Sequence, residues 1–186
     1  MRLENLDRLE RMQRVVIIGT SGSGKTTLAA RIASARGWPH IPLDAVHFLS
    51  NWVERPLDDF RDRTLTAVQS SNCWTLDGNY SKVRDITWGR ATTLIWLNYS
   101  FPVVFWRVFI RTMQRSLSGR DVVPGCRETL SKAFFQRDSI LLWAITTYNR
   151  RRREYPLLLR QPEYQHLDVI ELTAPRQADK LIGMLE

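Results

Sequence analysis

The sequence contains few cysteines and no long uninterrupted apolar run. Its 186 residues include only Cys73 and Cys126, which are too few and too far apart to indicate a disulfide framework or a zinc knuckle. The longest apolar region, residues 96–110, is broken by polar residues, a proline and an arginine, and so predicts no membrane span. The densely charged N-terminal segment lacks the apolar core of a secretory signal. We therefore expect a reducing, cytoplasmic setting.

The chain also lacks a linker rich in proline, glycine or serine, and its length suits one domain, residues 1–186, with a sizeable core. Its formal net charge of +8 is unevenly distributed. Residues 102–160 contain 12 Lys and Arg against 4 Asp and Glu, and the remainder is balanced. A basic segment of this kind suits nucleic acid, an acidic membrane or the phosphates of a nucleotide, with a solvated charged face as the alternative.

Residues 17–29, IIGTSGSGKTTLA, contain the phosphate-binding pattern G-x-x-x-x-G-K-[ST]. The fixed positions of this pattern are Gly19, Gly24, Lys25 and Thr26. Such a match needs a strand before it and a helix after it. The run VVII at 15–18 is typical of a buried parallel strand, and TLAARIASAR after the lysine is rich in helix formers. The sequence therefore predicts a nucleoside triphosphate site and not an ordinary glycine turn.

The residue types of this loop match the chemistry of a phosphate chain. Glycines let successive backbone N–H groups point at phosphate oxygens, and the helix N-terminus adds partial positive charge. Lys25 would reach the β and γ phosphates. The Thr26 hydroxyl would lie where Mg²⁺ binds, because this ion prefers oxygen ligands shared with the phosphates. ATP and Mg²⁺ are therefore the expected cofactors.

Strands and helices are expected to alternate along the chain. The predicted strands after the first cover residues 40–44, 73–77, 92–98 and 166–172. Helical stretches are expected at 57–70, 102–115 and 130–153, with a short leading helix, a short terminal helix and a polar loop at 117–127. Alternation of this kind predicts an α/β fold in which helices cover both faces of a parallel sheet.

Two aspartates end predicted strands on the edge of the sheet that carries the phosphate loop. Ligands of such sheets bind beyond the carboxyl ends of the strands. Asp77 closes an apolar strand, which is the usual position of a carboxylate that holds Mg²⁺, although a turn aspartate is the alternative. Asp44 would either accept a proton from an acceptor hydroxyl, orient the acceptor, or cap a helix. His47 could point into the same cleft or have a structural role.

Arginines recur at every fourth residue of the predicted helix 102–115. Arg107, Arg111 and Arg115 therefore form one stripe, and their mutual repulsion would be relieved by an anion. Phosphoryl transfer is catalysed mainly by positioning and by neutralising charge on the transferred group. We therefore interpret Arg107 and Arg111 as candidate catalytic residues, with a solvent-facing basic helix as the alternative. The run NRRRRE at 149–154 adds four arginines, some of which must face water.

The order of these motifs resembles the adenylate kinase branch of the P-loop kinases, and LDGNYSKVR at 76–84 is similar to the LDGFPR segment of adenylate kinases. More closely, the segments PLDAVHF, WTLDGNYSKVRD, LIWLNYSF and RETL resemble the topology modulation (FlaR-like) family. The matches run from about residue 14 to 153. The threonine-glycine and glutamine contacts by which adenylate kinases recognise AMP have no clear counterpart, so the acceptor remains open.

This resemblance implies a P-loop nucleoside-phosphate kinase-like fold with a five-stranded parallel sheet and a small lid at about 115–130. It implies that ATP is held by Gly19, Gly22, Ser23, Gly24, Lys25, Thr26 and Thr27, and Mg²⁺ by Thr26 and Asp77. The lid would bring Arg107, Arg111 and Arg120 toward the phosphates and exclude water. Trp52, Trp74 and Tyr80 could line the acceptor pocket, although Trp74 suits core packing better.

The leading interpretation is a kinase that transfers the γ-phosphate of Mg-ATP to a nucleotide or another small hydroxyl or phosphate acceptor. A GTPase switch is disfavoured, because neither D-x-x-G nor N-K-x-D follows the phosphate loop. The non-enzymatic alternative is an ATP-regulated nucleic-acid-binding protein that uses the basic segment 102–160.

Overall fold

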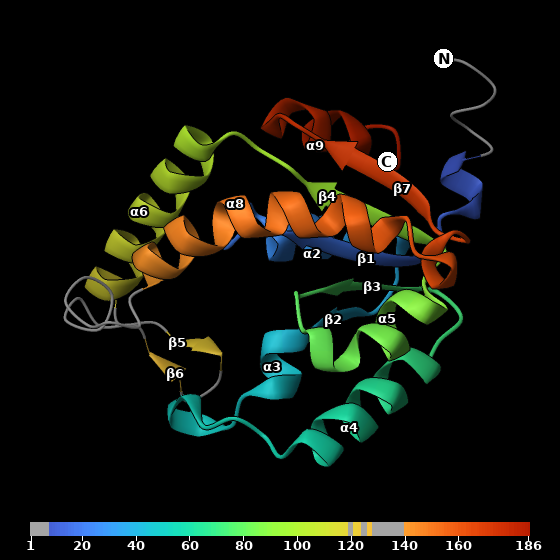
Figure 1. Cartoon of the computed structure of the whole chain (residues 1–186), viewed down its shortest axis with the longest axis horizontal. Coiled ribbons are helices and arrows are strands. Elements are labelled where there is room, and N and C mark those ends of the chain that lie inside the picture. Colours follow the sequence, from blue (N-terminus) through green and yellow to red (C-terminus); the bar gives the residue numbers. More distant parts are fainter. Residues whose placement is uncertain (1–7, 119–120, 124–125, 128–139) are drawn as a thin grey trace.

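A parallel five-stranded sheet forms the centre of the molecule, and helices cover both of its faces (Figure 1). The computed structural model describes residues 8–118, 121–123, 126–127 and 140–186, with side chains described for 8–114 and 146–186. The strands of the sheet are β1 (Arg14–Gly19), β2 (His40–Pro42), β3 (Trp74–Asp77), β4 (Thr93–Leu97) and β7 (Asp168–Leu172). Their spatial order is β2-β3-β1-β4-β7, and every neighbouring pair is parallel. The predicted five-stranded α/β fold is confirmed.

The helices lie between these strands in the sequence, except α9, which follows the last strand. The α-helices are α2 (Lys25–Arg36), α3 (Leu43–His47), α4 (Leu57–Gln69), α5 (Arg84–Arg90), α6 (Phe101–Ser118), α8 (Ile140–Leu159) and α9 (Pro175–Ile182). Short 3₁₀ turns are η1 (Ser50–Trp52), η2 (Ser81–Val83) and η3 (Pro162–Tyr164). Within the described residues, no helix combines the length and the apolar content needed to cross a bilayer.

Strand β1 supplies side chains to two separate hydrophobic cores. Val15 and Ile17 pack on one side of the sheet, and Val16 and Ile18 pack on the other, as expected from the two-residue period of a strand. All four side chains are completely buried. This explains why residues 15–18 of β1 are all apolar and β-branched. Their burial also fixes the position of the loop that follows Gly19.

Some predicted boundaries differ from the structure. The strand predicted at 40–44 ends at Pro42, and the next residues form the short helix α3, so Asp44 lies in the first turn of a helix. Proline cannot donate a ladder hydrogen bond, which explains why pairing ends there. The sequence also gave no prediction of α5 as a separate helix. Helix α3 begins directly after the carboxyl end of β2, where it shapes the site.

The predicted lid at about 115–130 is only partly described. In place of the loop predicted at 117–127, α6 continues to Ser118, and two short antiparallel strands follow, β5 (Asp121–Val123) and β6 (Cys126–Arg127). The predicted helical stretch at 130–153 corresponds to α8, which begins at Ile140 and extends to Leu159. Arg120 and residues 128–139 lie outside the described part of the chain.

Candidate functional site

The phosphate loop lies between β1 and α2, as predicted, and has the backbone conformation that its glycines permit. Gly22 has a φ of 79° and Gly24 a φ of 95°, in the left-handed region. A Cβ atom on Gly22 would lie 2.1 Å from Cγ2 of Val108, a side chain of α6. Helix α6 therefore presses on the loop so closely that only glycine fits at residue 22.

The loop has the features expected of a phosphate cradle. Gly24 is the N-cap of α2 and provides no side-chain cap, so the N–H groups of the first turn lack acceptors within the helix. The Ser23 hydroxyl is fully buried and has no hydrogen-bond partner among the described residues. Unsatisfied donors at a helix N-terminus suit an anion. The residues present therefore fit the phosphate chain of ATP.

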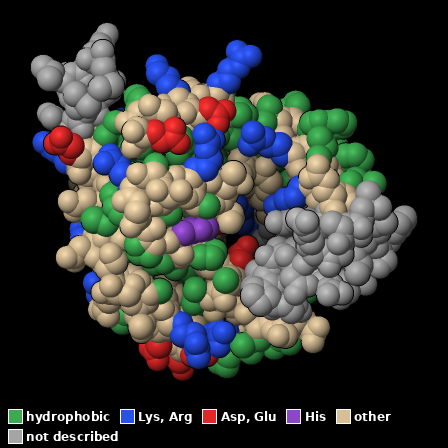
Figure 2. Space-filling view, turned by 180° about the vertical axis from the view of Figure 1, so that it is seen from behind, with side chains coloured by type: hydrophobic (Ala, Val, Ile, Leu, Met, Phe, Trp, Pro, Cys, Tyr) green, Lys and Arg blue, Asp and Glu red, His purple; other side chains and the backbone are tan. Residues whose placement is uncertain are grey.

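A cavity of about 340 Å³ opens beside this loop. It is lined by residues 22–28 and by Tyr99, Arg107, Arg111 and Asp179, among others. Two of the three arginines predicted to form a stripe therefore face the same space as the phosphate loop; the Arg115 side chain lies outside the described part. Arg107 donates a hydrogen bond to the Ser23 carbonyl over 3.2 Å and lies over the ring of Tyr99. Figure 2 shows basic side chains gathered around a hollow in this face of the molecule, with an acidic side chain at its edge.

Lys25 begins helix α2 and points back over the loop. Its ammonium donates a hydrogen bond to the Thr20 carbonyl over 3.2 Å. Burial lowers the pKa of Lys25 to about 8, and the positive charges of Arg151 and Arg111 add to this effect against the opposing influence of Asp77 and Asp44. An anionic ligand would stabilise the charged form of a lysine in such positive surroundings.

The Thr26 hydroxyl and the Asp77 carboxylate meet at the predicted metal position. The hydroxyl donates to Asp77 Oδ2 over 2.6 Å, although 51 residues separate the two in the sequence. The other carboxylate oxygen, Oδ1, lies 2.7 Å from Nε2 of His40 at the start of β2. Asp77 is almost completely buried. Thr26 and Asp77 would hold Mg²⁺ together with phosphate oxygens, and His40 fixes the orientation of the carboxylate.

Asp44 and Tyr80 form a second polar pair on the same rim. The phenol of Tyr80 donates to Asp44 Oδ1 over 2.6 Å. Burial raises the pKa of Tyr80, and the Asp44 carboxylate raises it further, so Tyr80 remains a hydrogen-bond donor. Asp44 itself is exposed, and the bond from Tyr80 occupies only its Oδ1 atom. The second carboxylate oxygen could therefore accept a hydrogen bond from the hydroxyl of a ligand.

The side chains of His47 and Trp74 are both buried in the protein interior. The His47 ring is buried among Phe48, Phe60 and Tyr80, with ring centroids 4.6–4.7 Å away. Its burial favours the structural alternative over a role as base. Trp74 is completely buried and donates its indole N–H to the Val68 carbonyl, which is the core role preferred for it.

Three residues at the site were not singled out from the sequence. Asn79 donates to the Gly19 carbonyl over 2.6 Å, and Arg151 of α8 donates to the same oxygen over 3.3 Å. His40 contacts Asp77, as described above. Asn79 could have been found from its position two residues after Asp77. No local signal distinguishes Arg151 from the other arginines of its run.

No protein-family model and no curated protein matches this sequence. Solved structures do match. A shikimate kinase from Bacteroides thetaiotaomicron is 18% identical, with a TM-score of 0.51 over 93% of this chain and 96% of that chain. A shikimate kinase from Acinetobacter baumannii in complex with shikimate is 14% identical, with a TM-score of 0.54 over 96% and 93% of the two chains. The chain has the fold of the P-loop kinases.

A gluconokinase from Sinorhizobium meliloti 1021 shares this P-loop kinase fold, at 19% identity and a TM-score of 0.50 over 94% of this chain and 93% of that chain. Each likeness extends over nearly the whole chain. The resemblance to the topology modulation family stays a prediction, because none of these neighbours belongs to it by name.

Proposed function

We propose that this protein is a phosphotransferase that moves the γ-phosphate of Mg-ATP to a small acceptor. The observation that carries this proposal is the 2.6 Å contact between Thr26 and Asp77 at the N-terminus of α2. A glycine loop alone would only bind phosphate. A hydroxyl and a buried carboxylate meeting beside Lys25 provide a position for Mg²⁺ that also touches the phosphates.

The cations around the cavity would stabilise the charge of the transferred group. Bound Mg-ATP would supply the phosphoryl group and part of the charge neutralisation. Lys25 lies next to the loop, and Arg107 and Arg111 reach the cavity from α6. Helix α2 holds Lys25 and helix α6 holds both arginines, so the packing of these two helices sets the positions of the three cations before a nucleotide arrives. Such preorganisation is the main source of rate in phosphoryl transfer.

The Asp44–Tyr80 pair supports an acceptor that offers a hydroxyl group. Tyr80 donates to one oxygen of Asp44, and the second oxygen could accept from the hydroxyl and orient it. In the transfer, the acceptor oxygen would form a bond to the γ-phosphorus while the bond from that phosphorus to the β–γ bridging oxygen breaks and ADP leaves. The hydroxyl proton would pass to Asp44 or to water.

The test is ADP production from Mg-ATP by the purified protein with a panel of acceptors. The kinase neighbours are named for shikimate and gluconate, so these two compounds come first, followed by nucleosides, nucleoside monophosphates and other hydroxylated metabolites. Lys25→Ala is the control and should lose turnover while it keeps its fold. A cytoplasmic setting, where ATP is abundant, belongs to the same proposal.

The outcomes separate the two functions considered for this chain. One acceptor that stimulates ADP production at least tenfold, and only with Lys25 present, supports the kinase. Wild-type turnover in Lys25→Ala would reject the assignment of the phosphate loop. Slow hydrolysis that no acceptor stimulates would favour an ATP-regulated binding protein, and a salt-dependent affinity for DNA that persists at saturating Mg-ATP would then identify nucleic acid as its partner.

A further inference from the structure

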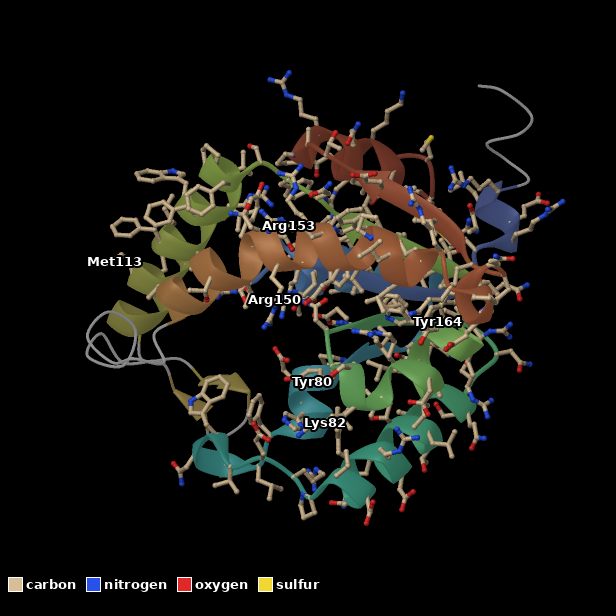
Figure 3. All side chains as sticks on the ribbon, in the orientation of Figure 1. Tyr80, Lys82, Met113, Arg150, Arg153 and Tyr164 are labelled. Atoms are coloured by element: carbon tan, nitrogen blue, oxygen red, sulfur yellow. The ribbon has the colours of Figure 1, made fainter. Side chains whose placement is uncertain are left out.

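Helix α6 presents apolar side chains to solvent. Phe101, Phe105 and Ile110 each expose 37–38% of their surface, and Trp106 exposes 60%. These four residues form two rows of neighbours one turn apart, 101–105 and 106–110, and we call them the outer face of α6. Figure 3 shows Met113, which follows Ile110 by three residues, on the outer side of the same helix and away from the sheet. Large apolar side chains that gather on a surface mark a contact site, whereas single ones do not.

The rings of the outer face contact one another. The centroids of Phe101 and Phe105 are 5.8 Å apart, and Trp106 stacks on Phe109 at the same distance. Phe101 also lies edge-on to Tyr148 of α8, at 5.3 Å. Figure 2 shows hydrophobic side chains gathered over α6, at the upper right of that view. Because these rings support one another, they lose little rotamer freedom when a partner covers them.

The described charged side chains of α6 lie on the opposite side of the helix. Arg107 and Arg111 line the cavity beside the phosphate loop, and α6 contains no Asp or Glu. A helix at the surface of a protein usually buries its apolar face and exposes its charges. Helix α6 instead turns these arginines toward the cavity and its aromatic rings toward solvent. Contact through the outer face therefore requires no burial of either charge.

The outer face is large enough to hold two copies of the chain together. Aromatic side chains bury about 150–250 Å² each, so the exposed parts of the four residues, with the half-buried Met113, provide about 400 Å² of apolar surface per copy. Homodimer interfaces are roughly 65% apolar, which gives about 600 Å² per copy and about 1,200 Å² for both. This area is at the lower end of stable interfaces and suits a dimer that forms at micromolar concentrations.

The lack of charged residues in the outer face decides between possible partners. Helices that lie on membranes carry Lys and Arg beside their apolar side chains, where the cations reach lipid headgroups. Arg107 and Arg111 instead line the cavity, and Arg107 donates to the Ser23 carbonyl. The net charge of +8 opposes the association of two copies unless they meet through an uncharged surface. The outer face is such a surface, and it favours a second copy over a bilayer.

We propose that two copies of this chain associate through the outer faces of α6. A two-fold axis would place each face against the same face of the other copy, so that Phe105 and Trp106 of both copies become buried. The cavity on the opposite side of α6 would stay open. This proposal goes beyond the proposed function and does not depend on it, because it rests on the outer side of the helix only.

Sedimentation velocity of the full chain, between about 1 and 100 µM, tests this association. The mass should rise from 21.8 kDa to twice that value as the concentration increases. Trp106→Glu should raise the dissociation constant of the dimer by about 10²-fold or more, because the two-fold axis introduces the buried charge twice. Ile110→Glu should act in the same direction. The matched control is Leu157→Glu on α8, which changes an apolar residue that is 65% exposed and should dimerise like the wild type.

Three results would overturn the proposal. A wild-type chain that stays monomeric at the highest concentration would exclude the dimer. A dimer that neither α6 substitution weakens would use another surface. A monomer that binds vesicles of phosphatidylserine and phosphatidylcholine, and loses this binding in Trp106→Glu, would identify a bilayer as the partner of the outer face. If Trp106→Glu does not fold, as judged by circular dichroism, Ile110→Glu decides by the same measurements.

Discussion

Val108 of α6 lies so close to Gly22 that a methyl group added at residue 22 would come within 2.1 Å of its Cγ2 atom. Gly22 also has a φ of 79°. Gly22→Ala must therefore move either the phosphate loop or α6, at a cost of about 1–3 kcal/mol in stability. We expect ATP affinity to fall at least tenfold, measured by calorimetry. Gly37→Ala is the control, because its φ is 67° but nothing lies within 4 Å of the added carbon. Equal effects of the two substitutions would show that contact with Val108 is unimportant.

Asp77→Asn should raise the Mg²⁺ concentration needed for half-maximal turnover by about tenfold or more, because the amide keeps a hydrogen-bond acceptor for Thr26 but loses the charge. Turnover is measured over a Mg²⁺ titration at saturating ATP. Asp168→Asn serves as the control, since that carboxylate pairs with Arg8 away from the phosphate loop. A titration of Asp77→Asn that overlays the wild-type curve would exclude Asp77 from the metal site.

Arg111→Ala should lower kcat by about 10²-fold or more while it changes KM for ATP much less, if the guanidinium acts on charge that develops in the transition state. Steady-state kinetics with the best acceptor would measure both constants. Arg63→Ala on α4 removes an arginine whose partner is Asp59 and should leave both unchanged. An increase in KM alone would mean that Arg111 binds ATP equally in the ground state and in the transition state.

The affinity for ATP should depend on pH through Lys25. The pKa of this lysine is about 8 without nucleotide, and bound phosphates favour its charged form. At pH 7 most molecules are charged and ready to bind, whereas at pH 9 only about a tenth are, so the affinity should fall about tenfold between these values. ATP is fully ionised through most of this range. Lys25→Arg should bind with little pH dependence, and an equal slope in both proteins would assign the effect to another group.

His47 should make the protein less stable in acid. Burial lowers the pKa of this histidine in the folded state, so the unfolded chain takes up a proton first as the pH falls below about 6.5. The free energy of unfolding should therefore decrease below that pH, by at most about 1.4 kcal/mol per pH unit for one proton. Urea denaturation of wild type and His47→Gln between pH 7 and pH 5 measures the difference. An unchanged slope in His47→Gln would contradict the assignment.

Two parts of the site could be predicted from the sequence. The phosphate loop follows from its glycines and lysine, and the meeting of Thr26 with Asp77 follows from the rule that parallel strands end on one edge. The helix α3 could not be predicted, because the apolar segment at Pro42 and Leu43 also suits a strand. The contact of Arg151 with Gly19 depends on how α8 packs across the sheet, and adjacent arginines have no local feature that separates them.

The bond between Gly19 and Arg151 joins residues 132 positions apart, and this has a consequence for synthesis on the ribosome. The phosphate loop leaves the ribosome well before α8 and the edge strand β7. A nascent chain therefore has its lysine long before it has the arginine that faces it. We expect nascent chains that still lack α8 to recognise ATP weakly, so that such molecules do not consume the nucleotide.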